Sequence, residues 1–219
     1  MLDNLPNSIV KNILNEEEIS KILSDIESYE NPRLNGHVGQ LTFDIRLDQS
    51  VIDKVTKIAE QIYGGPVILQ EYNLSRYHNN KMIDREDDII PILFPHTDFF
   101  PTGRVTLDYQ FRSNTSWGIV VDNKDSVSEY ILNDNELLSF SGTHQVHWRN
   151  KKVFNDNDFM EMIFFHFEPV GAENISINFK NNIKDWAKSR FLEWAQTPGK
   201  NSNLGTEEEN IRRYDRVPE

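Results

Sequence analysis

The sequence predicts a mixed α+β fold that is mainly β: an antiparallel β-sandwich or barrel with helices packed on one face. Two amphipathic helical patterns fall within the first 63 residues, and a series of short strand-like segments follows them up to residue 169. These segments are rich in β-branched and aromatic residues, and Asn, Asp, Gly and Ser separate them, as expected for an antiparallel β-domain. Helices that precede such a run of strands usually cover one side of it.

The N-terminal part begins with a predicted short strand over residues 8–14. Asn15 then has the side chain of a helix N-cap, and the three glutamates that follow suit the positive end of a helix dipole. Residues 31–39 are expected to form a loop, and the alternating segment QLTFDIRL after them a strand. A second amphipathic helix is predicted over residues 50–63, where a Gly-Gly-Pro sequence ends it.

The β-region consists of closely spaced strand candidates with one long polar interruption. Residues 78–93 form that interruption and are expected to be a lid or rim loop. A C-terminal helix is predicted over residues 181–196, followed by a polar tail. We expect a single domain over residues 1–219, with a core of about 8–169 and a helical extension and tail over 181–219. The strand candidates are PVILQEYNLSRYH, GRVTLDYQFRS, SWGIVVD, SEYILNDNELLSFSG, HQVHWRN and DFMEMIFFHFEP.

Composition excludes several classes of function. The chain has 219 residues and no cysteine, so disulfides, thiolate metal sites and cysteine nucleophiles are ruled out, and a cytoplasmic protein is expected. A formal net charge of −12 argues against nucleic-acid partners, because it repels phosphate backbones. Without an apolar run of the roughly 20 residues that a span requires, no membrane association is expected.

The segment FPHTDFF contains the strongest candidate for a chemical site. In a strand, residues i and i+2 share a face, so His96 and Asp98 present an imidazole and a carboxylate side by side. About fifty residues later, a second predicted strand carries His147 and Arg149 on one face and His144 on the other. Two histidines and one carboxylate form the ligand set of non-haem Fe(II) oxygenases. An isolated H-x-D motif is often only a hydrogen-bonding pair on the surface. His144 is the alternative to His147 as the third metal ligand.

Taken together, these motifs resemble the Fe(II)/2-oxoglutarate-dependent oxygenase superfamily, most nearly its prolyl-4-hydroxylase-like branch. The similarity covers about residues 8–169. IVKNILNEEEISKIL is similar to the opening strand and helix of the family, LQEYNLSRYH to the strand before the metal loop, PHTD to the H-x-D motif, and NELLSFSGTHQVHWRN to the stretch that leads to the distal histidine.

The resemblance implies a double-stranded β-helix (jelly-roll, cupin-like) core with His96, Asp98 and His147 as Fe(II) ligands and catalytic centre. It also implies 2-oxoglutarate as co-substrate and O₂ as oxidant, with succinate and CO₂ as co-products. A C–H bond of a small molecule, an amino acid or a peptidyl side chain would be hydroxylated or otherwise oxidised. Related halogenases usually have a small residue in place of the carboxylate, so Asp98 favours hydroxylation.

The residue that holds the distal carboxylate of 2-oxoglutarate does not follow from the resemblance. The family usually supplies an Arg or Lys from the strand after the distal histidine, whereas FMEMIFFHF contains no cation. Arg149 is the first substitute because it shares a face with His147 and can grip a carboxylate bidentately. Arg112 and Arg104 are the next candidates, and Tyr77 or Tyr109 could add a hydroxyl group.

Other readings of the same residues stay open. His166 is expected to be a packing residue, and Trp148 to lie behind the site. A cupin-like metal enzyme that does not use 2-oxoglutarate, or a non-catalytic jelly-roll binding protein, would also account for the motif. Neither the substrate nor the oligomeric state follows from the sequence.

Overall fold

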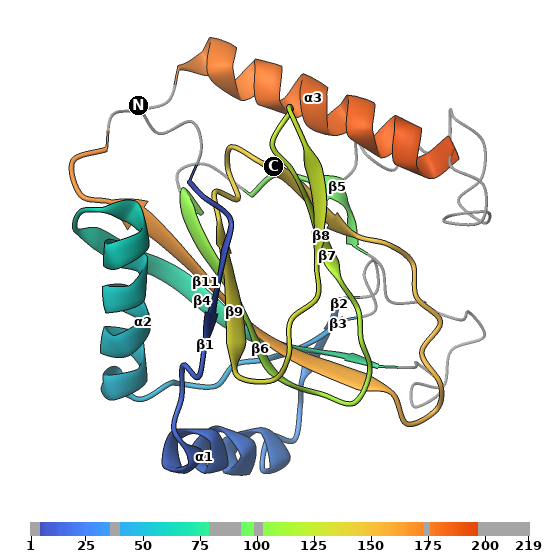
Figure 1. Cartoon of the computed structure of the whole chain (residues 1–219). Coiled ribbons are helices and arrows are strands. Elements are labelled where there is room, and N and C mark those ends of the chain that lie inside the picture. The colour runs from blue at the N-terminus through green and yellow to red at the C-terminus, as the bar shows by residue number, and fades with distance from the viewer. Residues whose placement is uncertain (1–4, 36–39, 79–92, 99–102, 173–175, 197–219) are drawn as a thin grey trace.

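Two antiparallel β-sheets face each other and enclose the interior of the protein (Figure 1). The computed structural model describes residues 5–35, 40–78, 93–98, 103–172 and 176–196. In spatial order, the larger sheet contains β1 (Ser8–Lys11), β9 (Glu136–Phe140), β6 (Val105–Ser113), β11 (Phe159–Pro169), β4 (Val67–His78), β3 (Gln40–Phe43) and β2 (Arg33–Asn35). The smaller sheet contains β5 (Leu93–His96), β10 (Val146–Arg149), β7 (Ile119–Asp122) and β8 (Val127–Tyr130). This is the predicted mainly-β, jelly-roll architecture.

The two N-terminal helices pack on the outer face of the larger sheet. Helix α1 (Glu16–Glu27) begins at a capping box in which Asn15 and Glu18 each accept a hydrogen bond from the other's backbone N–H. Helix α2 (Gln49–Tyr63) ends at Gly64, whose φ of 79° is the left-handed conformation that glycine tolerates. The buried sides of both helices join one apolar cluster with Leu74, Leu107, Ile163 and Phe165 of the sheet.

Several predicted element boundaries were wrong. The strand predicted over QLTFDIRL ends at Phe43, and SEYILNDNELLSFSG contains two strands, β8 and β9, that lie in different sheets. The first strand ends at Lys11 rather than at residue 14, because Asn12 has a φ of 56° and turns the chain away from the sheet. The expected loop over 31–39 contains the short strand β2, which pairs with β3. The C-terminal helix α3 (Ile177–Gln196) begins before residue 181. The predicted lid at 78–93 lies largely outside the described residues, as does the tail from 197.

Alternation along the central strand β11 separates the interior from the outer face. Met160 and Met162 point between the sheets and pack with Trp117 and Phe140, whereas Ile163 and Phe165 point toward the helices. β4 and β6 pair with β11 over most of its length, with one register shift in each pairing, so the inward residues between these shifts form rows across the interior. The interior is therefore lined by defined positions of each strand, and a polar residue at one of them faces the inside of the barrel.

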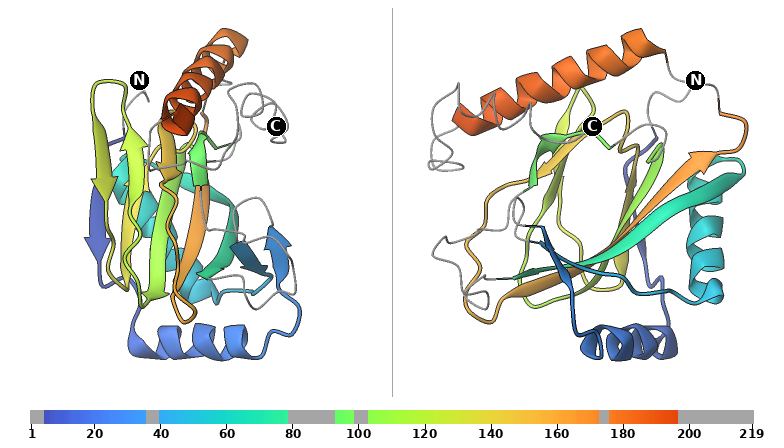
Figure 2. Two further views of the ribbon diagram at one scale, coloured as in Figure 1. Left: turned by 90° about the vertical axis from the view of Figure 1, so that its right-hand side faces the viewer. Right: turned by 180° about the vertical axis from the view of Figure 1, so that it is seen from behind.

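Helix α3 covers the outer face of the smaller sheet. It lies at the end of the molecule opposite α1, as the further views also show (Figure 2). Phe191 contacts Phe94 of β5 with ring centroids 5.8 Å apart, and the same cluster includes Val146 and Trp148 of β10. The helix thus supports the two strands that carry His96 and His147. Among the described residues, no helix is long and apolar enough to cross a membrane.

We expect Phe191→Ala to lower the free energy of unfolding by about 3–5 kcal/mol, because it opens a cavity between α3 and the smaller sheet. Denaturation in urea measures this loss. Ser189→Ala, on the exposed side of the same helix, is the control and should change stability by no more than about 0.5 kcal/mol. An equal effect of the two substitutions would contradict the packing of α3 described above.

Candidate metal centre

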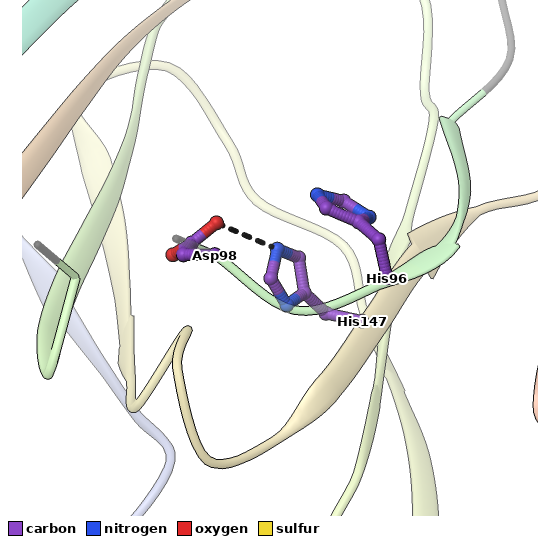
Figure 3. Close-up of side chains that lie close together, drawn as sticks. All are labelled: His96, Asp98 and His147. Atoms are coloured by element: carbon purple, nitrogen blue, oxygen red, sulfur yellow. Dashed lines mark ion pairs between the residues drawn. The ribbon is translucent and has the colours of Figure 1, made fainter. Parts of the chain in front are cut away.

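The strand pairing of the smaller sheet places two histidines next to each other. His147 on β10 is the direct register partner of His96 on β5. Their rings lie with centroids 4.3 Å apart. Asp98 follows two residues after His96, and Oδ1 of its carboxylate lies 3.4 Å from Nε2 of His147 (Figure 3). One possible ligand atom from each of these three residues lies within 4.8 Å of the other two.

Both histidines are held with the same ring nitrogen free for a ligand. Nδ1 of His96 donates to the carbonyl oxygen of Phe94 at 2.9 Å, and Nδ1 of His147 donates to that of Gln145 at 3.1 Å. In each case the acceptor is the residue two positions earlier in the chain. In the neutral ring this fixes the tautomer in which Nε2 carries the lone pair, which is how metal-binding histidines are commonly oriented.

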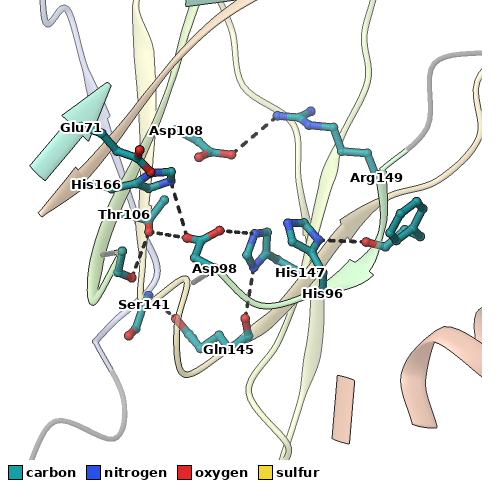
Figure 4. A network of polar contacts seen from close by, with 12 residues as sticks. Glu71, His96, Asp98, Thr106, Asp108, Ser141, Gln145, His147, Arg149 and His166 are labelled. Atoms are coloured by element: carbon teal, nitrogen blue, oxygen red, sulfur yellow. Dashed lines mark hydrogen bonds and ion pairs between the residues drawn. The ribbon is translucent and has the colours of Figure 1, made fainter. Parts of the chain in front are cut away.

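Asp98 is fixed by backbone and side-chain contacts on several sides. Its N–H donates to the carbonyl oxygen of Gly142 at 2.8 Å, which ties the end of β5 to the turn before β10. The hydroxyl group of Thr106 donates to Oδ2 at 2.8 Å. Since Oδ2 is engaged in this way, Oδ1 is left to face His147 (Figure 4).

Two glycines leave just enough room for the Asp98 carboxylate. A Cβ atom at Gly103 would lie 2.9 Å from both Cβ and Oδ2 of Asp98, and Gly103 also has a φ of 82°. A Cβ atom at Gly142 would overlap Oδ2 of Asp98 and lie 2.5 Å from Oγ1 of Thr106. The carboxylate therefore occupies a space between Gly103 and Gly142, called the cradle below, that the methyl group of an alanine at either position would fill.

Gly142→Ala is accordingly expected to displace the Asp98 carboxylate and weaken the binding of Ni(II) or Mn(II) by about tenfold or more, as losses of supporting contacts commonly do at metal sites. Titration calorimetry of the metal measures the change. Gly65→Ala is a matched control, because its Cβ would only touch the Tyr63 side chain at 3.4 Å. Unaltered metal affinity in Gly142→Ala would contradict the cradle.

The electrostatics of the cluster keep its acid ionised and one histidine neutral. Burial, reinforced by the neighbouring His147, lowers the pKa of His96 to about 4. Burial opposes ionisation of Asp98, but the nearby His147 and His166 rings outweigh it and hold the pKa of Asp98 well below its usual value. His147 is also penalised by burial, yet the Asp98 carboxylate raises its pKa. An ionised carboxylate beside a neutral imidazole is the donor state that a divalent cation requires.

His166 belongs to this network, and its expected role as a packing residue was wrong. Its Nδ1 lies 2.8 Å from Oε1 of Glu71 on β4, and its Nε2 lies 3.6 Å from Oδ2 of Asp98. Burial disfavours the charged ring, but the two carboxylates outweigh it and raise the pKa of His166 to about 9. The sequence carries no local signal for this contact, because it depends on β11 lying beside β6 and β4.

The competing histidine does not join the cluster. Nδ1 of His144 lies 2.8 Å from Oγ1 of Thr143, and its ring packs near Phe179 of α3 with centroids 4.9 Å apart. Trp148 points to the outer face of the smaller sheet, where it packs with α3 residues. His147 is therefore the residue of this segment that the structure brings to His96 and Asp98.

Arg149 lies in the interior, two residues along the same strand from His147. Its side chain is 2% exposed, and Nη1 donates to the carbonyl oxygen of Trp117. Nη2 lies 4.0 Å from Oδ2 of Asp108 on β6, and Nε has no hydrogen-bond partner among the described residues. A buried guanidinium with so few acceptors is unusual, because an unpaired buried charge is costly. Burial also lowers its pKa.

Of the other candidates for binding the co-substrate, Arg104 pairs with Glu168 at 3.1 Å. The remaining three divide between the two faces of the larger sheet. Tyr77 points inward, where its ring contacts Trp117 and burial raises its pKa. Tyr109 points outward into the cluster under the helices and donates to Asn135 at 3.0 Å. Arg112 pairs with Glu161 on that same outer side. Arg149 and Tyr77 are thus brought to the interior, whereas Arg112 and Tyr109 are not.

Comparisons with known proteins identify the fold through structure alone. No protein-family model matches the sequence, and no curated protein is similar enough in sequence to match it. HygX from Streptomyces hygroscopicus, solved with nickel, 2-oxoglutarate and hygromycin B bound, superposes with a TM-score of 0.56 at 10% identity, covering 78% of this chain and 85% of HygX. SnoN, a non-heme α-ketoglutarate-dependent epimerase from nogalamycin biosynthesis, superposes with a TM-score of 0.57 at 13% sequence identity. The match covers 83% of this chain and 85% of SnoN.

A prolyl hydroxylase from Trichoplax adhaerens, in complex with a peptide fragment of hypoxia inducible factor, superposes with a TM-score of 0.50 at 13% identity over 75% of this chain and 84% of the hydroxylase. An epimerase and a prolyl hydroxylase carry out different reactions, so the similarity shows a shared architecture. The chain therefore has the double-stranded β-helix fold of the Fe(II)/2-oxoglutarate-dependent oxygenases.

Proposed function

We propose that this protein is a non-haem Fe(II)/2-oxoglutarate-dependent dioxygenase that oxidises a C–H bond of a small molecule, an amino acid or a peptidyl side chain. The observation that carries the proposal is the convergence of His96, Asp98 and His147, with ligand atoms within 4.8 Å of one another inside this fold. Two imidazoles and one carboxylate leave coordination positions open, which is the arrangement of such oxygenases. We also propose a cytoplasmic location, in line with the cysteine-free sequence.

The residues present fit an Fe(II) ion. In their neutral forms His96 and His147 carry the lone pair on Nε2, the Asp98 carboxylate is ionised, and two glycines give that carboxylate its space. When bound, Fe(II) with 2-oxoglutarate and O₂ supplies the oxidation of a C–H bond, with succinate and CO₂ as co-products. The protein's part is to keep the three ligands on one side of the ion and to hold Asp98 in place through Thr106.

Arg149 is the residue that we propose to hold the distal carboxylate of 2-oxoglutarate. Arg149 lies two positions after His147 on β10, about 7 Å along the strand, which is a distance that a five-carbon dicarboxylate can bridge. Its Nε and Nη2 lack a close oxygen acceptor among the described residues, and through this edge a guanidinium can bind a carboxylate bidentately. The Tyr77 hydroxyl group is proposed as a further contact in the interior.

This proposal is tested without knowledge of the substrate. The full chain is loaded anaerobically with Fe(II), and 2-oxoglutarate is then added. A visible charge-transfer band is expected when a 2-oxo acid chelates the iron, and slow succinate release is expected when O₂ is admitted. Iron binding without any effect of 2-oxoglutarate would favour a cupin-like metal enzyme instead. Absence of iron binding would leave a jelly-roll binding protein.

A further inference from the structure

The interior contains a second acid, Asp108, to which the proposed function gives no role. Asp108 lies on β6, is 4% exposed and points toward Arg149, with 4.0 Å between Oδ2 and Nη2 (Figure 4). Over the part of the chain that the structure describes, its carboxylate accepts no hydrogen bond. A buried carboxylate without a close donor is costly. The two groups are therefore too far apart for a hydrogen bond to each other, and Nε of Arg149 is a buried donor without a partner among the described residues.

The surroundings of Asp108 make its charge easy to remove. Burial is the largest influence and raises the pKa of Asp108 to about 6, although the Arg149 guanidinium acts in the opposite direction. Several other titratable groups act on it electrostatically. They are Arg149 and His147 from β10, Asp98 after β5, His166 from β11 and Tyr77 from β4.

The spacing of Arg149 and Asp108 lets a carboxylate bound to Arg149 lie beside Asp108. Hydrogen bonds from a guanidinium to a carboxylate are about 2.8 Å long, so an oxygen bound to Nη2 would lie within about 7 Å of Oδ2 of Asp108. The unpartnered Nε lies on the same edge of the guanidinium, which directs the ligand to that side. Two carboxylates beside one buried cation resist being ionised together, and one of them then takes a proton.

We propose that Asp108 is a second ligand-binding residue of this pocket, which takes up a proton from solvent as an anionic carboxylate binds Arg149 and then donates a hydrogen bond to that carboxylate. The proposal rests on the proposed function for the identity of the ligand, the distal carboxylate of 2-oxoglutarate. It makes co-substrate binding dependent on pH. Above the pKa of Asp108 the free site has an ionised acid that must be protonated, so affinity falls as pH rises; below it the acid is already neutral.

The experiment is titration calorimetry of 2-oxoglutarate into the Ni(II)-loaded full chain between pH 6 and 8.5. Buffers of different ionisation enthalpy report the number of protons taken up. For the wild-type chain we expect uptake approaching one proton at pH 8 and a Kd that rises up to tenfold per pH unit. Asp108→Asn should bind without this uptake, with a Kd that varies little with pH. Asp134→Asn is the matched control, because Asp134 is exposed and contacts Gln110 rather than Arg149.

A second ligand keeps the test informative if Asp108→Asn fails to fold. 2-Oxobutyrate chelates a metal like 2-oxoglutarate but lacks the distal carboxylate, so its binding to the wild-type chain should take up no such proton. Equal proton uptake for the two acids, or identical pH profiles of the wild-type chain and Asp108→Asn, would overturn the role of Asp108 while leaving the oxygenase proposal standing. Failure of 2-oxoglutarate to bind any variant at any pH would overturn both.

Discussion

Replacing Asp98 by alanine is expected to abolish 2-oxoglutarate turnover and to weaken divalent metal binding by more than about 100-fold. Loss of an outer contact at a metal site commonly costs about 10–100-fold, so loss of a ligand should exceed that range. Asp98 is also the only one of the three grouped residues that carries negative charge, and its carboxylate faces His147 at 3.4 Å. Without it, two imidazoles remain, which is a weak site for Fe(II).

Thermal unfolding with and without Ni(II) measures this effect independently of activity. A metal present at about 100 times its Kd stabilises the wild-type chain by about 2.7 kcal/mol, and this gain should disappear in Asp98→Ala. Asp125→Ala removes an exposed carboxylate of the β7–β8 connection and should keep the full stabilisation. Retained metal stabilisation in Asp98→Ala, together with unchanged turnover, would reject the proposed ligand set.

Replacing Arg149 by methionine is expected to raise the Kd for 2-oxoglutarate by about 10–150-fold while leaving metal affinity close to that of the wild-type chain. A hydrogen bond to a charged group contributes about 1.5–3 kcal/mol, which corresponds to this range. Methionine preserves the apolar length of the side chain, which lies beside the sulfur atoms of Met160 and Met162 at 3.9 Å. The loss should therefore reflect the guanidinium rather than a collapsed interior.

A ligand without the distal carboxylate shows whether Arg149 acts on that group alone. 2-Oxobutyrate, which has no distal carboxylate, should bind the wild-type chain and Arg149→Met equally well. Arg46→Met, at an exposed position, is the control for loss of one positive charge. A large loss of 2-oxoglutarate affinity in Arg112→Met, with none in Arg149→Met, would instead assign the distal carboxylate to the outer arginine.

Local sequence patterns predicted the features that depend on neighbours in the chain. The capping residue Asn15 precedes α1 because an N-cap is a property of a few consecutive residues. Strand alternation likewise predicted that His147 and Arg149 point to one face and Trp148 to the other, and these side chains lie accordingly. A period of two residues is a property of any strand, so it needs no knowledge of its partners.

Alternation failed where a strand is irregular. Arg112 is four residues from the inward-facing Asp108 and would share its face in a regular strand. The pairing of β6 with β11 shifts between Glu161 and Met162, because Glu161 opposes Arg112 while Met162 opposes Gln110. The extra residue, Phe111, turns Arg112 to the outer side, where it meets the Glu161 carboxylate.

The sequence by itself determined the mainly-β fold class, the pairing of His96 with Asp98 on one short segment and the later strand that carries His147. Only the tertiary structure decided which other groups surround them. Gly142 lies against the Asp98 carboxylate, His166 lies near Oδ2 of that carboxylate, and Asp108 lies opposite Arg149. The physical reason is that the face of a residue follows from backbone geometry, whereas the strand beside it is fixed by long-range pairing and packing of the whole sheet.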